Sequence, residues 1–295
     1  MNSAVYNDLI VRKIPFTFLD HCEPIWNKQQ PEWSHMINGA SLTMPYLEPF
    51  LIRNVREAMP QISDERLKID ARGFVGQEAQ HYQNHERYNQ MLRDKGHEQL
   101  AELEQQFKQT YKQMQKKSLK WRLAYTAGFE TMTVGVTEWL INHRDQLFAN
   151  ADPVVTSFVL WHMVEETEHK NVAFDVFEHL YPRSYWARTW GLLVGSWHVA
   201  WLTRKGYMSM LKKEGRWYRL GSRLRVYRKV MEFVLKAGPA MLKAFAPSYH
   251  PSKVTDPKWV AQWVNAYNVQ DDHAIPLLDT RADNIKPEFA AASSI

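Results

Sequence analysis

Two Glu-x-x-His pairs, Glu78–His81 and Glu166–His169, are the residues of this 295-residue chain best suited to metal chemistry. Residues three apart lie on the same face of a helix, so each pair presents a carboxylate and an imidazole side by side. In the core of a four-helix bundle, two such pairs and one inward Glu from each of the other two helices can hold two metal ions. The sequence therefore predicts a dinuclear metal site, provided that two further helices supply the missing carboxylates.

Both pairs lie in core-facing patterns that are apolar at their ends and ionisable in the middle. The later pattern is Val155, Val159, His162, Glu166, His169, Ala173, Val176 and Leu180, and the earlier one is Leu67, Ala71, Phe74, Glu78, His81, His85, Tyr88 and Leu92. Burying an unpaired carboxylate is costly, so several carboxylates that face one core are expected to share a cation. The same spacing of four and three residues places Glu166 in the core-facing row. It places Glu165 and Glu168 at the flanks of this row.

Two more predicted helices supply the missing carboxylates. One begins near Thr43 and ends near Met59, and its core-facing row contains Glu48. The other has Glu130 in its row, which is Leu123, Ala127, Glu130, Val134, Thr137 and Ile141. Glu57 and Glu138 are the competing acids, but they lie outside these rows. The chain thus has the order Glu, Glu-x-x-His, Glu, Glu-x-x-His.

The sequence therefore predicts six residues that bind metal and act in catalysis: Glu48, Glu78, His81, Glu130, Glu166 and His169. His85 and His162 lie in the same core-facing rows. Because a buried histidine more often bonds a carbonyl or carboxylate than a metal, we expect these two to support the ligands through hydrogen bonds.

The predicted fold class is all-α, an antiparallel four-helix bundle with additional C-terminal helices. Residues 1–40, with three prolines and no long period, are expected to form an irregular N-terminal arm. Residues 41–182 form the metal-binding bundle, and its fourth helix is expected to run from Asp152 to about Tyr181. Residues 183–245 are an aromatic and basic helical extension of the same domain, and residues 246–295 are a Pro-rich C-terminal tail.

Composition limits the environment and the class of protein. Hydrophobic residues make up 45% of the chain, which is ample material for a core. The single cysteine, Cys22, excludes a disulfide framework and a thiolate metal cluster, and it fits a reducing compartment. The N-terminal segment lacks the apolar stretch of a secretory signal. We therefore expect a cytoplasmic protein.

The net charge of +5 is unevenly distributed, because residues 183–229 hold 12 Lys and Arg and one acid, Glu214. Four tryptophans, Trp186, Trp190, Trp197 and Trp201, lie in the same region. One interpretation is that these residues form a charged surface that only contacts solvent. The other is that they contact the inner face of an anionic membrane. The apolar stretch from Trp190 to Leu202 is too short to span a bilayer. No nucleic-acid fold signature accompanies the charge, so nucleic acid is not favoured as a partner.

Residues 10–245 resemble bacterial proteins called predicted metal-dependent hydrolases. The most specific stretches are FVGQEAQHYQNH at Phe74–His85 and HMVEETEHKNVAFD at His162–Asp175. The wider pattern is similar to the ferritin-like di-iron carboxylate proteins, and this resemblance implies the same six ligands. In many di-iron oxygenases an Asp precedes the Glu of each pair and orients a histidine from the facing helix. Gln77 and Glu165 occupy those positions here, which implies that they support the ligands.

Mixed Glu and His ligands suit two metal ions, with iron expected and manganese or zinc as alternatives. The favoured interpretation is an oxygen-activating oxidoreductase that acts on a lipophilic small molecule and receives electrons from a redox partner. The family label favours a different reaction, hydrolysis by a metal-activated water. A third interpretation is metal storage or oxidation without an organic substrate. The sequence leaves the oligomeric state open.

Overall fold

The computed structural model describes residues 8–20, 22–268 and 275–289. Within these ranges the regular elements are helices, and the only β pairing is an isolated bridge between Leu278 and Phe289. The all-α prediction is therefore confirmed.

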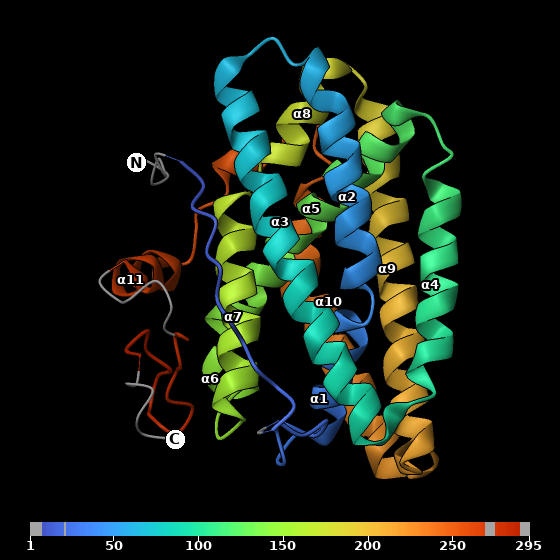
Figure 1. Cartoon of the computed structure of the whole chain (residues 1–295), viewed down its shortest axis with the longest axis vertical. Coiled ribbons are helices and arrows are strands. Elements are labelled where there is room, and N and C mark those ends of the chain that lie inside the picture. Colours follow the sequence, from blue (N-terminus) through green and yellow to red (C-terminus); the bar gives the residue numbers. More distant parts are fainter. Residues whose placement is uncertain (1–7, 21, 269–274, 290–295) are drawn as a thin grey trace.

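The long helices run side by side, and α11 lies at one side of them (Figure 1). The bounds of the α-helices are α1 Pro31–Ser41, α2 Met44–Ala58, α3 Glu65–Leu92, α4 Leu100–Met114, α5 Leu119–Asn142, α6 Arg144–Leu147, α7 Pro153–Glu168, α8 Val172–Leu180, α9 Tyr185–Lys213, α10 Leu220–Lys243 and α11 Lys258–Tyr267. Short turns of other helix types lie at Met59–Gln61, Arg93–His97, Arg216–Tyr218 and Pro251–Lys253.

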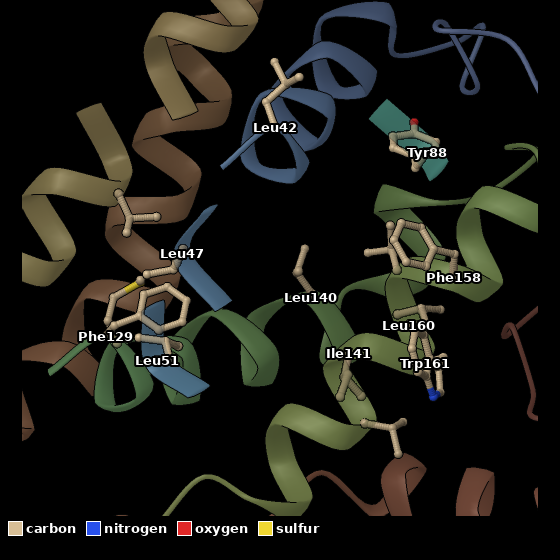
Figure 2. Close-up of a cluster of buried hydrophobic side chains, with 14 of the residues drawn as sticks. Leu42, Leu47, Leu51, Tyr88, Phe129, Leu140, Ile141, Phe158, Leu160 and Trp161 are labelled. Atoms are coloured by element: carbon tan, nitrogen blue, oxygen red, sulfur yellow. The ribbon is translucent and has the colours of Figure 1, made fainter. Parts of the chain in front are cut away.

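Helices α2, α3, α5 and the α7–α8 pair carry the predicted site and pack together. Helix α2 packs against α3 and α5, and α5 also packs against α7 and α8. Figure 2 shows the apolar packing around them, with Leu47 and Leu51 of α2 near Phe129 of α5. Large rings of α7, including Phe158 and Trp161, fill another part of the core. The core-facing rows read from the sequence therefore meet inside the molecule.

Two local features differ from the predicted elements. Helix α1 lies within the segment expected to be irregular, because Pro31 takes the first helical turn, where the missing N–H is not needed. The expected fourth helix is interrupted: α7 ends at Glu168, His169 has φ −101° and ψ 9°, and α8 begins at Val172. Two residues of the break have side-chain partners, because Asn171 donates to Asp175 at 2.6 Å and Lys170 donates to the Val254 carbonyl at 2.6 Å.

Helix α9 approaches its neighbours at glycines. A Cβ on Gly191 would lie 2.0 Å from the Ala124 carbonyl of α5, and one on Gly39 of α1 would lie 2.6 Å from the Thr203 carbonyl of α9. The inward face of α9 is buried by these close crossings. Among the described residues no helix is both long and apolar enough to cross a bilayer.

Both ends of the described chain lie on the same side of the bundle (Figure 1). The N-terminal arm is extended there, and α11 packs against α7. Part of the expected C-terminal tail is thus a helix docked on the bundle.

Candidate metal centre

The six predicted ligands converge in the bundle core. Glu48 comes from α2, Glu78 and His81 from α3, Glu130 from α5, Glu166 from α7, and His169 from the residue that ends α7. Each has at most 3% of its surface exposed. Donor atoms of Glu78, Glu130, Glu166 and His169 all lie within 4.8 Å of one another, and so do those of Glu48, Glu78 and His81. Glu78 belongs to both groups, so the two groups form one continuous centre.

The imidazoles of the two Glu-x-x-His pairs both face the carboxylates. His169 Nε2 lies 3.2 Å from Glu78 Oε1, 3.5 Å from Glu166 Oε2 and 3.6 Å from Glu130 Oε2. His81 Nδ1 lies 3.7 Å from Glu78 Oε1 and 3.8 Å from Glu166 Oε1. These separations allow an ion to lie between the donor atoms.

The hydrogen bonding of these residues fits metal ligands. Both carboxylate oxygens of Glu48, Glu78 and Glu130, together with Glu166 Oε2, His81 Nδ1 and His169 Nε2, are buried without a hydrogen-bond partner among the described residues. Buried polar atoms are rarely left unpaired, because the desolvation of each one costs free energy. Here all of them point into one cluster. The donor set therefore fits two cations that mixed carboxylate and imidazole ligands prefer, such as iron, manganese or zinc.

The carboxylates of the centre strongly influence one another. Burial, together with the charge of Glu78, raises the pKa of Glu48 well above its usual value, and burial together with Glu166 does the same for the pKa of Glu130. Burial also opposes ionisation of Glu166, but the nearby His169 and His162 hold its pKa well below the usual range. Without a cation beside them, Glu48 and Glu130 are therefore favoured in their protonated, neutral forms.

Gln77 and Glu165, the residues that precede the two ligand glutamates, hold the ligand histidines in a crossed pattern. Glu165 of α7 accepts a hydrogen bond from His81 Nε2 of α3 at 2.9 Å. Gln77 of α3 accepts one from His169 Nδ1 at 2.9 Å. In each histidine one ring nitrogen is thereby fixed and the other faces the carboxylates, which is how metal-binding histidines are usually oriented.

A buried arginine that sequence reasoning missed completes this outer layer. Arg12 lies on the N-terminal arm with 2% exposure and bonds Glu165 at 3.0 Å and Glu168 at 2.6 and 2.8 Å. Its guanidinium also lies 5.5 Å from the ring centres of Trp263 and Tyr267 on α11. Glu168, expected at a flank, is therefore buried between Arg12 of the arm and Gln77 of α3, which donates a hydrogen bond to it at 2.9 Å. No local pattern in the sequence identifies Arg12, since its partners are more than 150 residues away.

His85 and His162 form a hydrogen-bonded chain at the edge of the centre. His162 bonds Glu166 at 2.9 Å, His85 bonds His162 at 2.9 Å, and Ser41 bonds His85 at 2.8 Å. Burial lowers the pKa of both histidines, so the neutral forms are favoured. Both rings also lie within 4.8 Å of a Glu48 oxygen, at a distance where a metal ligand is geometrically allowed.

The competing acids lie away from the centre. Glu57 has half of its side chain exposed and forms a salt bridge with Arg122 at 2.8 Å. Glu138 is absent from the clusters of residues that could hold a metal among the described positions.

A second histidine–carboxylate cluster, which the sequence did not predict, joins α1, the turn after α3 and the end of α9. His35 Nε2 lies 3.0 Å and His97 Nε2 lies 3.4 Å from the carboxylate of Glu214. Arg216 donates a hydrogen bond to the same carboxylate at 2.7 Å. We call this the Glu214 cluster.

Comparison with known proteins gives one match. Residues 10–255 match the family model described as predicted metal-dependent hydrolase. No curated protein and no solved structure matches the chain.

Proposed function

The chain belongs to the predicted metal-dependent hydrolase family, and we propose that it is an enzyme that holds two iron ions in the six-residue centre and uses dioxygen to oxidise a lipophilic substrate. The family match supports a metal-dependent enzyme. The identity of the metal and the type of reaction are our inference from the centre.

One observation carries the proposal: buried carboxylate and imidazole atoms without protein partners all face one another. Four glutamates can balance the charge of two divalent cations, and the two imidazoles favour transition metals over calcium or magnesium. The crossed bonds from Glu165 and Gln77 fix the ligand rings before any metal arrives. Such a preformed site is suited to a resident metal cofactor.

The surroundings of the centre favour oxidation over hydrolysis. The Phe74 ring lies 4.9 Å from the His169 ring, and the Trp161 ring lies 5.1 Å from the His81 ring. These aromatic walls exclude water, which benefits reactive oxygen chemistry and suits an apolar substrate. When bound, two redox-active irons would supply electrons to dioxygen. In a hydroxylation, one oxygen atom enters a C–H bond and the other leaves as water, which consumes two protons and two electrons from an external donor.

Hydrolysis is the second candidate, and the family description is the finding that favours it. In that reaction a metal-activated water would attack an ester, amide or phosphoester bond. For this reaction, both water and a polar substrate would have to reach the buried six-residue centre.

Metal analysis of protein purified without oxygen separates these functions. We expect about two irons per chain, from the two-metal geometry of such centres, and a change in the absorption spectrum when air is admitted. The Glu130→Gln variant should lose the bound iron and the spectral change. The Glu138→Gln variant, a control on the same helix, should keep the bound iron and the spectral change.

Three other results would contradict the proposal. A zinc-loaded protein that hydrolyses ester substrates and is indifferent to dioxygen would support hydrolysis. Loading with many irons per chain would support storage. A protein that binds no metal at its six-residue centre would rule out both metal-dependent reactions.

A further inference from the structure

The outward face of α9 is an exposed apolar stripe. Its members recur every three or four residues and are therefore aligned on one side of the helix. They are Trp186 (80% exposed), Trp190 (59%), Leu193 (52%), Trp197 (73%) and Trp201 (43%). We call these residues the α9 stripe. With about 1.5 Å of rise per residue, the stripe is about 22 Å long.

The opposite face of α9 is also apolar, but it is buried. Leu192, Val199 and Leu202 have at most 6% exposure and pack toward α5 and α1, next to the glycine crossings. A helix that is apolar on every side is normally covered on every side. Large exposed apolar patches on a folded protein mark interaction sites. The α9 stripe therefore needs an occupant that the folded chain does not provide.

Positive charge borders the α9 stripe. At its C-terminal end, the Arg204 guanidinium lies 5.6 Å and the Lys205 ammonium 6.0 Å from the ring centre of Trp201. Arg183, which is exposed, precedes the other end. The occupant must therefore combine an apolar layer with negative charge.

Helix α10, which follows α9 after the turn at Arg216–Tyr218, repeats this combination. Hydrogen bonds from Tyr185 and Arg188 to the carbonyls of Phe245 and Ala244 bring the start of α9 to the end of α10. Exposed apolar side chains follow one face of α10: Leu220, Leu224, Tyr227, Met231, Val234, Leu235 and Leu242.

The bases of this region fall into two groups. Arg225 pairs with Glu32 at 2.8 Å, Lys229 with Glu232 at 2.9 Å and Lys213 with Glu98 at 2.5 Å, so these three stabilise the fold. Arg219, Arg223 and Arg228 have no acidic partner within 4.0 Å among the described residues. The second group is available to a negatively charged surface.

We propose that the α9 stripe docks on an anionic membrane surface, with the helix lying in the plane of the membrane. The tryptophan rings would enter the interfacial layer, where their apolar body and polar N–H are both satisfied, and the arginines would contact lipid phosphates. A second copy of the chain fits less well. A symmetric dimer through this face would bring together two regions that each hold 12 bases and one acid, and these regions would repel each other.

A cavity of about 190 Å³ lies beside the stripe and is lined by Trp190 and Gly191 of α9 and by Trp121, Ala124 and Tyr125 of α5. Its lining is mostly apolar, and α5 continues from it to Glu130. If the proposed function holds, docking would place this cavity next to a source of lipophilic substrate. Docking itself does not depend on the reaction.

Flotation with phosphatidylglycerol vesicles tests the docking. Wild-type protein should float with these vesicles at low salt, return to solution as salt is added, and bind phosphatidylcholine vesicles weakly. The variant Trp186→Ser/Trp197→Ser should lose at least 10-fold in affinity, because both rings point outward. Neutralising Arg219, Arg223 and Arg228 to Gln should cost on the order of 100-fold at low salt. Ile69→Ser removes an apolar side chain on α3 that is 41% exposed and lies outside the α9 stripe, so this control should bind as wild type does.

Three results would overturn the docking proposal. If wild-type protein stays in solution with phosphatidylglycerol vesicles at low salt, the α9 stripe is not a membrane-docking surface. Binding that survives the tryptophan changes uses another surface. A concentration-dependent dimer that the tryptophan changes dissociate, together with no vesicle binding, would identify a second copy as the occupant. Metal content measured on the same samples reports on the proposed function separately.

Discussion

The candidate metal centre and the Glu214 cluster both bring histidines to within bonding distance of carboxylates, yet their charges are balanced in different ways. In the metal centre, both oxygens of Glu48, Glu78 and Glu130 lack a hydrogen-bond partner among the described residues. In the Glu214 cluster, Arg216 bonds the carboxylate directly and 23% of the side chain is exposed. Burial would raise the pKa of Glu214, but the nearby His35 and His97, together with the bond from Arg216, lower it well below its usual value.

The position of the nearest arginine explains this difference. Arg216 contacts the carboxylate that the histidines approach, so the Glu214 cluster is neutralised by its own residues. Arg12 contacts Glu165 and Glu168 but none of the six predicted ligands. The ligand carboxylates are left for cations from solution. Proximity of histidine and glutamate is thus a weaker sign of a metal site than the absence of a protein cation on the carboxylate.

The largest expected effect is the loss of metal from Glu166→Ala. Glu166 lies among Glu78, Glu130 and His169, so its removal deletes a ligand from the most crowded part of the centre. We expect the metal content, measured by elemental analysis, to fall from about two ions per chain to one or none. Glu168→Ala is the control two residues away and should retain its metal, although it loses bonds to Arg12 and Gln77. The opposite pattern would mean that the predicted register is wrong.

A smaller loss of affinity is expected from Gln77→Leu. This change removes the acceptor for His169 Nδ1, so the ring is no longer held toward the carboxylates. Residues that orient a ligand in this way typically contribute about 10- to 100-fold to metal affinity. Competition with a chelator would measure the loss. Gln80→Leu, on the same helix, should leave the affinity unchanged, and equal effects of the two changes would contradict an orienting role.

Metal removal should destabilise the wild-type protein. At a free metal concentration 100 times the Kd, binding stabilises the folded state by about 2.7 kcal/mol. For a chain of this size we expect chelation to lower the Tm by on the order of 5 °C. Calorimetry before and after chelation measures this shift. The shift should vanish in Glu166→Ala and persist in Glu214→Gln, and a shift that depended on Glu214 would place a metal in the second cluster.

The smallest expected effect is that of Glu214→Gln, which should change stability and leave metal content unaltered. Since the side chain is partly exposed, we expect a loss of about 1–2 kcal/mol in the free energy of unfolding at neutral pH. A folded-state pKa below the usual value stabilises the fold above the unfolded pKa, and this contribution is lost as the pH falls. The difference in the free energy of unfolding between the wild type and the variant should therefore become smaller below about pH 4.3. Denaturant unfolding across this range is the measurement, and a constant difference would contradict the ionic role.

Periodicity predicted the elements that position the centre. The core-facing rows of α2, α3 and α5 placed Glu48, Glu78 and Glu130 inward, because a helix buries one side and that side repeats at a fixed spacing. The same reasoning missed the break at His169, where Lys170 bonds a carbonyl more than 80 residues away. It also missed Arg12, whose hydrogen-bond partners Glu165 and Glu168 lie more than 150 residues away. Local patterns report which face of a helix is inward, but they do not report which distant segment covers it.

The sandwich of Arg12 between the α7 carboxylates and the rings of α11 has a consequence for the order of assembly. Arg12 leaves the ribosome early, Glu165 and Glu168 follow much later, and Trp263 and Tyr267 come near the end. When α7 has just emerged from the ribosome, the nascent chain would already hold the six predicted ligands, whereas α11 would not yet have been made. The layer around Arg12 therefore closes only after α11 has emerged. Until then, the ligand side chains would be open to whichever metal ion reaches them first.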